Sequence, residues 1–380
     1  MTRLVHLAAY PRPQAGSFIP FMRSVLDAAQ ARGWDVVAVL PTEAAGREWI
    51  GQFEDAEISV EYAYGSRRSL TRWLRGRLKD SDEQTILHTH FTGYDVPAAL
   101  AARGRPNVEV YWHIHTVLSD RPRARLANAL KFSLIGRGVK RVLTPSSDVA
   151  DELVKRGTKR EKVSVFPNAI DAEAFQPASP EQRARLRQEL GIPEGPDVLL
   201  HFGRDWYLKD GDIFLDALAI LIEQGRSVIG LVNQGGEAAQ RAAELRDLEA
   251  HVRLVGLFPQ PQKLYGAADL MVASSRGEGM PFAMIEALCS GLPVVASDLP
   301  GHRFMGDRVE SCAIVSRDAS KMATAIAAFL DMRSEARAAL GESAHRWIAE
   351  NLDLRAAAER LLDDYEQTLR ESGSHATVSR

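Results

Sequence analysis

Two glutamates, Glu278 and Glu286, lie eight residues apart in a segment that joins a short apolar run to a helix-like stretch. Residues 274–288 read Ser-Ser-Arg-Gly-Glu-Gly-Met-Pro-Phe-Ala-Met-Ile-Glu-Ala-Leu, which predicts one carboxylate on a loop and the other inside a helix. The N–H groups of such a loop and of the helix N-terminus can bind an anion, and Pro281 suits the first helical turn. Glutamates this far apart are also typical of solvent-facing or capping positions. The glycines and the flanking strands make the segment specific.

Two pairs of histidines have strand-like spacing. His88 and His90 alternate with apolar or small residues, and so do His113 and His115. On an extended chain, residues two apart point to the same face. Buried histidines more often have a structural role than a catalytic one, and we favour that interpretation for the pair at 88 and 90.

The elements that must position these side chains alternate regularly along the chain. Apolar, β-branched runs alternate with amphipathic stretches, such as the helix predicted for 18–32 with Gly33 as its C-terminal signal. Strands are predicted at 4–9, 35–40, 86–90, 108–113, 141–144 and 162–166, and then at 198–202, 227–231, 252–255, 270–273 and 293–296.

Alternation of this kind predicts an α/β fold with parallel sheets and helices on both faces. Two such series predict two doubly wound domains, joined through a Pro-, Ser- and Gly-rich connection at 176–196. Because doubly wound sheets bind ligands at the carboxyl ends of their strands, we expect a site in the cleft between the domains.

Composition excludes several classes of protein. The chain has 380 residues, of which 45% are hydrophobic and 26% charged, so it is neither disordered nor collagen-like. A net charge of −3 argues against a nucleic-acid partner. Apolar runs fall short of the roughly 18–20 residues that span a bilayer, and the N-terminal run is too short for a signal peptide. Two cysteines provide no disulfide framework, so we expect a cytoplasmic protein.

With its glycines and flanking strands, the segment at 274–288 resembles the E-x7-E motif of family-4-type retaining glycosyltransferases, which have the GT-B fold of two Rossmann-like domains. The resemblance continues through Gly291-Leu-Pro-Val-Val-Ala-Ser-Asp298 and Gly301. Further matches follow in family order and cover nearly the whole chain. They are Ile86–His90, Trp112–Thr116, Asn168–Asp171, and Gly203-Arg204 with Lys209.

The resemblance implies a role for each charged residue of this motif set. Arg204 and Lys209 match the basic pair that binds the donor diphosphate. Breaking the anomeric C–O bond leaves charge on a phosphate oxygen, which Arg can bind in bidentate fashion and Lys can stabilise as a point charge. Glu286 matches the residue that binds the ribose hydroxyls, and Glu278 the residue beside the transferred sugar.

The same resemblance implies further contacts with the donor. The backbone N–H groups of Met280 and Phe282 would touch the sugar or phosphate, and the base would lie near Leu257. His115, which follows a predicted strand, matches the histidine of the family's active site. Gly16 lies where relatives have two glycines, so the donor contacts of this loop differ from the family pattern.

One signal points to a metal. Asp210-Gly211-Asp212 has the D-x-D spelling of metal-dependent sugar transferases with a different fold. It precedes an apolar helical run, and we interpret Asp212 as a helix N-cap. We therefore expect no metal and no cofactor, with the nucleotide-sugar as co-substrate. The family has glycine after the lysine, so Asp210 places a negative charge close to the expected diphosphate site, and the sequence does not show how it is tolerated.

Positive charge is concentrated in two places. Six cations and no acids occur in 67–79, with Leu70, Trp73, Leu74 and Leu78 spaced as one helical stripe, and 121–141 is also free of acids. Such a basic amphipathic helix can lie on the inner face of a membrane, in which case the acceptor would be lipid-linked. The alternative is a helix whose stripe faces the protein core.

Together these observations predict an acceptor-binding domain at 1–170 and a nucleotide-sugar-binding domain at 171–352. The segment 353–380 is expected to form a helix that crosses back to the first domain, followed by a frayed tail after Glu371. The predicted activity is retaining, metal-independent transfer of a sugar, most simply from a UDP-sugar, to the hydroxyl of a glycan, lipid-linked or small-molecule acceptor. The alternatives are a GT-B-fold epimerase or phosphorylase and a non-catalytic module that binds a nucleotide-sugar or a glycan.

Overall fold

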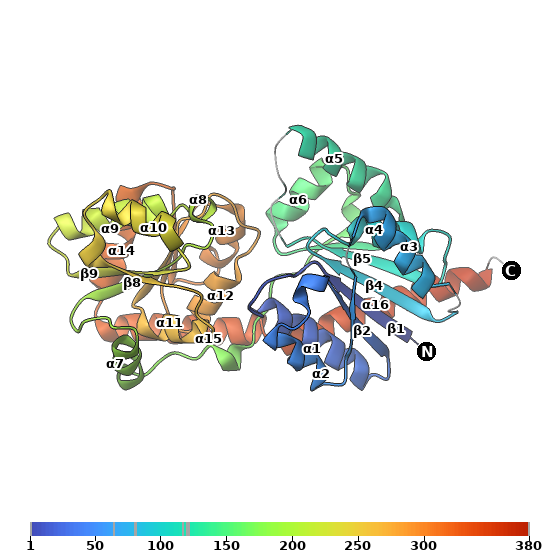
Figure 1. Cartoon of the computed structure of the whole chain (residues 1–380), viewed down its shortest axis with the longest axis horizontal. Helices are drawn as coiled ribbons and strands as arrows, with labels where there is room; N and C mark the ends of the chain where they lie inside the picture. Colours follow the sequence, from blue (N-terminus) through green and yellow to red (C-terminus); the bar gives the residue numbers. More distant parts are fainter. Residues whose placement is uncertain (1, 64, 80–81, 116–117, 119–121, 379–380) are drawn as a thin grey trace. The chain divides into compact units, whose positions relative to one another are not determined.

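The computed structural model describes residues 2–63, 65–79, 82–115, 118 and 122–378, with side chains as far as residue 372. The chain divides into two compact units (Figure 1). Unit 1 comprises Met1–Ala169 together with Leu354–Arg380, and unit 2 comprises Ile170–Asp353.

Unit 1 is built on a seven-stranded parallel sheet with the strand order β3-β2-β1-β4-β5-β6-β7. Its strands are β1 (Thr2–Ala8), β2 (Asp35–Leu40), β3 (Ser59–Tyr62), β4 (Gln84–His90), β5 (Val108–His113), β6 (Arg141–Thr144) and β7 (Val163–Val165). The register pairs His6 with His88 and His90 with His113. The chain therefore places imidazoles side by side on neighbouring strands.

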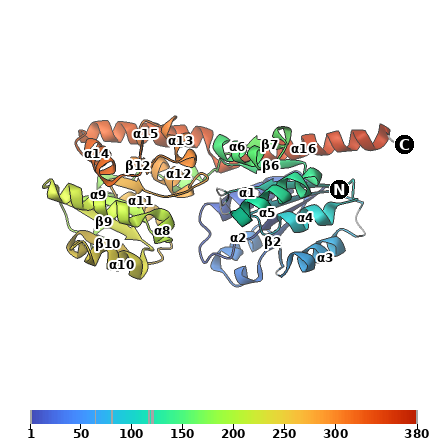
Figure 2. The same cartoon turned by 90° about the horizontal axis from the view of Figure 1, so that it is seen from above.

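Helices cover both faces of this sheet. On one face, the strand residues form a core with α3 (Arg67–Arg77), α4 (Asp95–Ala102), α5 (Pro122–Ser133) and α6 (Ser147–Lys155). The other face meets α1 (Phe18–Ala31) and α16 (Leu354–Val378), which lie side by side in both views (Figures 1 and 2). Arg32 connects the two elements, because it forms ion pairs with three carboxylates of α16. A short helix, α2 (Gly51–Glu54), precedes β3.

Unit 2 has a six-stranded parallel sheet with the order β10-β9-β8-β11-β12-β13. Its strands are β8 (Asp197–Phe202), β9 (Val228–Asn233), β10 (Val252–Val255), β11 (Leu270–Ala273), β12 (Val294–Ser297) and β13 (Cys312–Val315). The chain moves outward from β8 in one direction to β10 and then, from β11, in the other direction. Such a reversal marks the position where doubly wound sheets bind ligands.

Alternate residues of the unit 2 strands belong to two separate cores. Leu199 packs with α9 (Gly211–Glu223), α10 (Gly236–Glu244) and α14 (Ala319–Leu330), whereas Val198 and Leu200 pack on the opposite face. That second face is covered by α11 (Pro261–Ala267), α12 (Phe282–Cys289), α13 (Pro300–Gly306) and α15 (Ser334–Asn351). A side-chain period of two with both faces covered explains the continuous apolar runs of these strands.

The α/β prediction and the two doubly wound sheets are confirmed, but some elements differ from expectation. The short strands β3 and β13, each of four residues, were not predicted. The region 176–196, expected as a connection, lies within unit 2 and contains α7 (Pro180–Glu189), which has a capping box formed by Ser179 and Gln182. The C-terminal segment, expected to fray after Glu371, continues as helix to Val378.

The helix α3 packs its apolar stripe inward. Leu70, Leu74 and Leu78 are buried in the core of unit 1, and Trp73 packs against it. The arginines of α3 lie on its exposed side. This packing follows the core-facing alternative, so the leucines of this helix are not available to a lipid surface. No helix in the described ranges is long and apolar enough to span a bilayer.

Candidate functional site

Three of the predicted donor-site residues of unit 2 lie where β8 and β11 end. Arg204 and Lys209 follow β8, and Glu278 follows β11, its direct neighbour in the sheet. Parallel strands bring their carboxyl ends to one edge, so residues nearly 70 positions apart in the sequence come into contact there.

Two loops at this edge are joined by backbone contacts. The short helix α8 (Trp206–Lys209) accepts two hydrogen bonds from Arg276, through the backbone N–H to Leu208 O (2.8 Å) and through Nε to Tyr207 O (2.9 Å). Ser274 Oγ lies 2.9 Å from the carbonyl oxygens of Lys209 and Asp210. These contacts hold the loop that carries Lys209 against the loop that carries Glu278.

Lys209 and Glu278 form an ion pair. Lys209 Nζ lies 2.5 Å from Glu278 Oε1, and Ser275 Oγ lies 3.2 Å from the same oxygen. Both side chains are about one-fifth exposed, so the pair faces solvent in part. Arg204 is exposed and makes no ion pair or side-chain hydrogen bond with the described residues. Its guanidinium is therefore available to an anion, whereas the ammonium already has a carboxylate beside it.

Asp210 is tolerated because two arginines neutralise it. Its side chain is 1% exposed, and its carboxylate contacts Arg276 at 2.6 Å and Arg317 at 3.0 Å. Asp210 also occupies the N-cap position of α9 in the left-handed conformation, with φ of 50°. The prediction that Asp212 is the N-cap is therefore wrong, since Asp212 lies in the first turn and pairs with Arg246. Neither aspartate of the D-x-D spelling is a free carboxylate.

Glu286 lies inside α12 and is 6% exposed. The Tyr265 hydroxyl on α11 donates a hydrogen bond of 2.6 Å to Glu286 Oε2. Burial and the neighbouring carboxylate raise the pKa of Tyr265 well above its ordinary value, so the phenol keeps its proton and remains a donor. The Tyr265 ring also packs against Phe202, the last residue of β8, with ring centroids 5.6 Å apart. This contact connects Glu286 to the edge that carries Arg204.

The loop before α12 makes a close backbone contact with α13. A Cβ on Gly301 would lie 2.2 Å from Gly279 O and 2.6 Å from Glu278 O, so only glycine fits there. Pro281 is the N-cap of α12 rather than a first-turn residue, and Met280 is buried. Phe282 opens the helix, where the first N–H groups have no intrahelical acceptor. The contact with Gly301 therefore fixes the loop at Glu278 and Gly279 beside the N-terminus of α12.

The remaining residues with a predicted donor contact are Leu257 in unit 2 and Gly16 in unit 1. Leu257 is 52% exposed on the loop after the edge strand β10. Gly16 has φ of +53°, a conformation that L side chains rarely adopt, and a Cβ there would lie 3.2 Å from the Tyr10 hydroxyl. The conformation of the loop before α1 accounts for glycine at position 16 without any ligand.

His115 belongs to a cluster of histidines within unit 1. It is 8% exposed, and its Nε2 lies 3.0 Å from His90 Nδ1. Burial lowers the pKa of His115 to about 3, so the ring is neutral at neutral pH and acts as a hydrogen-bonding group rather than a charge. The cluster also contains His6, His88 and His113. Two groups of three rings could hold a metal ion, one formed by His6, His88 and His90 and the other by His90, His113 and His115. Thr116 and Arg121 lie outside the described residues.

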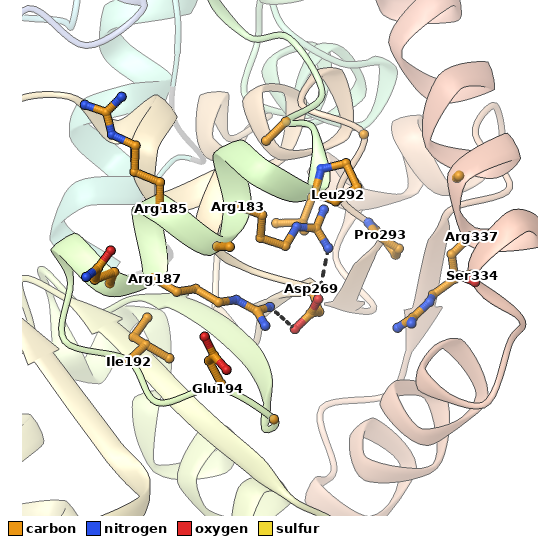
Figure 3. Close-up of a pocket in the computed structure, with 17 residues that line it drawn as sticks. Arg183, Arg185, Arg187, Ile192, Glu194, Asp269, Leu292, Pro293, Ser334 and Arg337 are labelled. Atoms are coloured by element: carbon orange, nitrogen blue, oxygen red, sulfur yellow. Dashed lines mark hydrogen bonds and ion pairs between the residues drawn. The ribbon is translucent and has the colours of Figure 1, made fainter.

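A cavity of about 820 Å³ in unit 2 lies away from this edge (Figure 3). It is lined by residues at the amino ends of β8, β11 and β12, including Gly195, Asp269 and Pro293. Arg183 and Arg187 reach Asp269 at 3.0 and 2.5 Å, as the dashed lines in Figure 3 show. Two other arginines of the lining also have carboxylate partners, since Arg185 pairs with Glu189 and Arg337 lies 4.0 Å from Asp197. Each arginine that lines this cavity therefore already contacts a carboxylate, whereas Arg204 has none among the described residues.

Sequence reasoning missed several residues of these sites. Tyr265 had no motif signal, and the arginines around Asp210 lie 66 and 107 positions away from it. His6 had no motif signal either, and only the observed register of β1 against β4 places it opposite His88.

Family models match both units. Residues 21–174 match the model described as Glycosyltransferase Family 4, and residues 196–332 match that described as Glycosyl transferases group 1. A D-inositol 3-phosphate glycosyltransferase of Nocardia farcinica is 31% identical over 254 residues, which are 63% of this chain and 55% of the relative. The D-inositol 3-phosphate glycosyltransferase of Geodermatophilus obscurus is 29% identical over 284 residues, which are 69% of this chain and 58% of the relative. The chain thus spans a little over half the length of these curated relatives.

Solved structures share the fold. A glycosyltransferase from Rickettsia africae superposes with a TM-score of 0.82 at 16% identity, covering 97% of this chain and 98% of that one. Anabaena HepE in complex with UDP and glucose superposes with a TM-score of 0.81 at 19% sequence identity, covering 96% of this chain and 99% of that one. The two sheets and these neighbours define a GT-B protein. The family matches then place it: the chain belongs to the family-4, group-1 type of glycosyltransferases.

Proposed function

We propose that this protein is a retaining, metal-independent glycosyltransferase that uses a UDP-sugar as donor. The observation that carries the proposal is the contact between Lys209 and Glu278 at the edge where β8 and β11 end, with Arg204 on the same loop as Lys209. Sugar transfer needs positive charge where the diphosphate leaves, and this edge offers it beside N–H groups of a loop and a helix. The solved complex of Anabaena HepE contains UDP and glucose, which supports a UDP-sugar donor.

In this proposal, unit 2 binds the donor through named groups. Arg204 holds a diphosphate oxygen, and Lys209 shares its ammonium between the diphosphate and Glu278. Glu286, oriented by Tyr265, accepts hydrogen bonds from the ribose hydroxyls. The backbone N–H groups of Met280, in the loop before α12, and of Phe282, the first residue of α12, contact the sugar or phosphate. Leu257 lies beside the base. The nucleophile attacks on the face from which the leaving group departs.

Unit 1 binds the acceptor in this proposal. His115 is neutral, so it orients a hydroxyl by hydrogen bonding and takes up no proton. The proton of the acceptor goes to the leaving phosphate, and no dedicated base and no metal are needed. Gly16 allows the loop before α1 to turn toward the substrates.

A peripheral membrane contact fits α5 better than α3. Leu126, Leu130 and Leu134 are 65%, 50% and 54% exposed and recur every four residues along one side of α5 and its end. Cations including Arg123 and Arg125 are exposed on the same helix. We propose that this surface meets an anionic membrane, where a lipid-linked acceptor would be found. Vesicles containing phosphatidylserine should retain the protein, and the triple Leu→Ser variant should remain in solution.

The deciding experiment is a thermal-shift screen of UDP, GDP, ADP and dTDP, followed by mass spectrometry of donor hydrolysis with the best nucleotide. UDP should give the largest shift, and UDP-sugars should be hydrolysed slowly without acceptor. Conversion of one UDP-sugar into another would instead indicate an epimerase, and turnover that requires inorganic phosphate would indicate a phosphorylase. Tight binding with no turnover would indicate a binding module.

A further inference from the structure

Five histidines share one face of the unit 1 sheet, beneath α1 and α16. His6 lies on β1, His88 and His90 lie on β4, and His113 and His115 lie on β5 and just beyond it. All five rings are buried, from 0% to 8% exposed. Burial of so many polar rings on one sheet face is costly unless each nitrogen finds a partner. The proposed transfer uses only His115, so four of these rings are unexplained by it.

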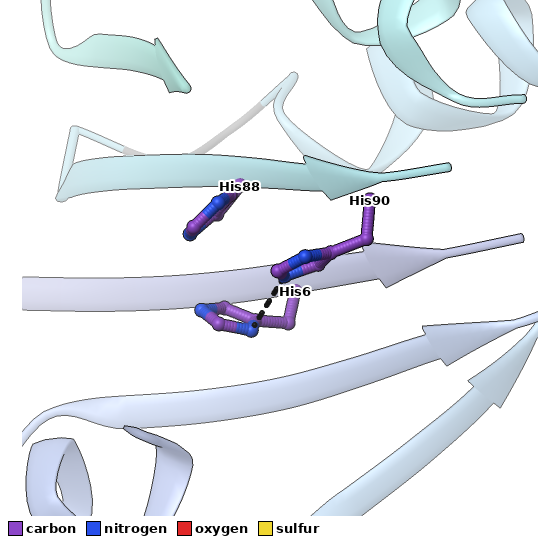
Figure 4. Close-up of side chains that lie close together, drawn as sticks. All are labelled: His6, His88 and His90. Atoms are coloured by element: carbon purple, nitrogen blue, oxygen red, sulfur yellow. Dashed lines mark hydrogen bonds between the residues drawn. The ribbon is translucent and has the colours of Figure 1, made fainter. Parts of the chain in front are cut away.

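Three of the rings converge. One nitrogen from each of His6, His88 and His90 lies within 4.8 Å of the other two, and Figure 4 shows the rings grouped across β1 and β4. His6 Nδ1 and His90 Nε2 are 3.3 Å apart. Two ligands of a tetrahedral zinc ion, each about 2.0–2.1 Å from the metal, are separated by about 3.3–3.4 Å. The observed separation matches two ligands of one ion, and it also matches an N–H···N hydrogen bond between the two rings.

The outer nitrogens of the same rings have partners. His6 Nε2 lies 3.3 Å from the Tyr365 hydroxyl, and His88 Nδ1 contacts the same oxygen. His90 Nδ1 lies 3.0 Å from His115 Nε2. If each outer nitrogen carries the proton, the lone pairs of His6 Nδ1, His88 Nε2 and His90 Nε2 remain for a metal. Zinc-ligating histidines are oriented in this way by a hydrogen bond at their second nitrogen.

A metal-free arrangement leaves one group unsatisfied. A proton between His6 Nδ1 and His90 Nε2 satisfies that pair, but His88 Nε2 is buried and has no hydrogen-bond partner among the described residues. An ion coordinated by all three rings removes this deficit. The second possible group, formed by His90, His113 and His115, has no such outer support, because both nitrogens of His113 lack a partner within the described chain.

We propose that His6, His88 and His90 provide three ligands of a Zn²⁺ ion that ties β1 to β4, with a water molecule in the fourth position. Imidazole nitrogens suit zinc, and burial keeps these rings neutral, as a metal ligand must be. Because the rings are enclosed, the ion enters before the fold closes and exchanges slowly afterwards. The ion takes no part in the proposed transfer, although its ligand His90 contacts His115.

The test measures metal rather than activity. The untagged protein is produced in zinc-supplemented medium, passed through gel filtration in EDTA and analysed by plasma mass spectrometry. Wild type should retain one zinc per chain, and His88→Gln should retain none. His201→Gln is the matched control, because His201 is also a buried strand histidine, on β8 of unit 2, and this variant should keep the zinc.

Two further measurements cover the case in which His88→Gln does not fold. Tyr365→Phe keeps all three imidazoles and should weaken zinc binding about 10–100-fold, the usual effect of losing a group that orients a ligand. Wild type produced with Co²⁺ should show the intense visible absorption of a four-coordinate ion. The proposal would be overturned if wild type contained no zinc or if His88→Gln contained as much zinc as wild type. It would also be overturned if Tyr365→Phe bound zinc with unchanged affinity or if the cobalt protein lacked that absorption.

Discussion

Replacement of Arg204 by alanine tests the proposed donor site most directly. Lys209 already has Glu278 at 2.5 Å, so the net charge of that pair is close to zero, whereas Arg204 has no carboxylate partner among the described residues. A unit charge about 4 Å away contributes about 4 kcal/mol at an effective dielectric constant of about 20. Loss of one preorganised donor costs about 10²–10³-fold in kcat, or roughly 2.7–4 kcal/mol. Both estimates lead us to expect a 10²–10³-fold lower kcat for Arg204→Ala.

The assay is release of UDP from a UDP-sugar, followed with and without acceptor, together with UDP affinity by calorimetry. Arg204 is exposed, so its replacement should change stability by no more than about 0.5 kcal/mol, and thermal unfolding checks this. Arg308→Ala is the matched control, since Arg308 is an exposed arginine of unit 2 that lies over Phe304, and it should keep full activity. If Arg204→Ala and Arg308→Ala were equally active, the assignment of the diphosphate site would be wrong.

Three other outcomes are expected. Gly301→Ala should lower the free energy of unfolding in urea by about 1–3 kcal/mol, because its Cβ would lie 2.2 Å from Gly279 O. Gly256→Ala is the control and should leave the free energy of unfolding unchanged, because a Cβ there would have no atom within 4 Å. Equal stabilities of the two variants would contradict the close approach at Gly301. Tyr265→Phe should raise the KM for the donor with little effect on kcat if Glu286 binds the ribose, and an unchanged KM would argue against this role. Burial lowers the pKa of His201 to about 4, from an ordinary value of 6.5, so its contribution to stability is complete above pH 6.5 and is lost as the pH falls toward 4. Wild type should therefore lose about 3 kcal/mol relative to His201→Gln between those pH values in urea unfolding, and parallel pH profiles would refute this.

Much of the fold could be predicted because its signals are local. The strands at 35–40, 108–113, 141–144, 252–255 and 270–273 were predicted at their observed bounds, since each contains β-branched or other apolar residues close together. The order of strands and loops also placed Arg204 and Glu278 at carboxyl ends, because parallel strands fix which loops share an edge.

Contacts between distant segments could not be read in this way. Asp210 was an unexplained negative charge until the fold brought Arg276 and Arg317 to it, and the stripe of α3 fitted a membrane as well as a core until its leucines were found buried. The convergence of His6 with the histidines of β4 depends on strand register, which a single strand does not encode. Periodicity and helix signals are properties of neighbouring residues, and they determined the architecture and the candidate motifs. Charge neutralisation, burial and the meeting of ring nitrogens depend on distances across the fold, and only the tertiary structure decided them.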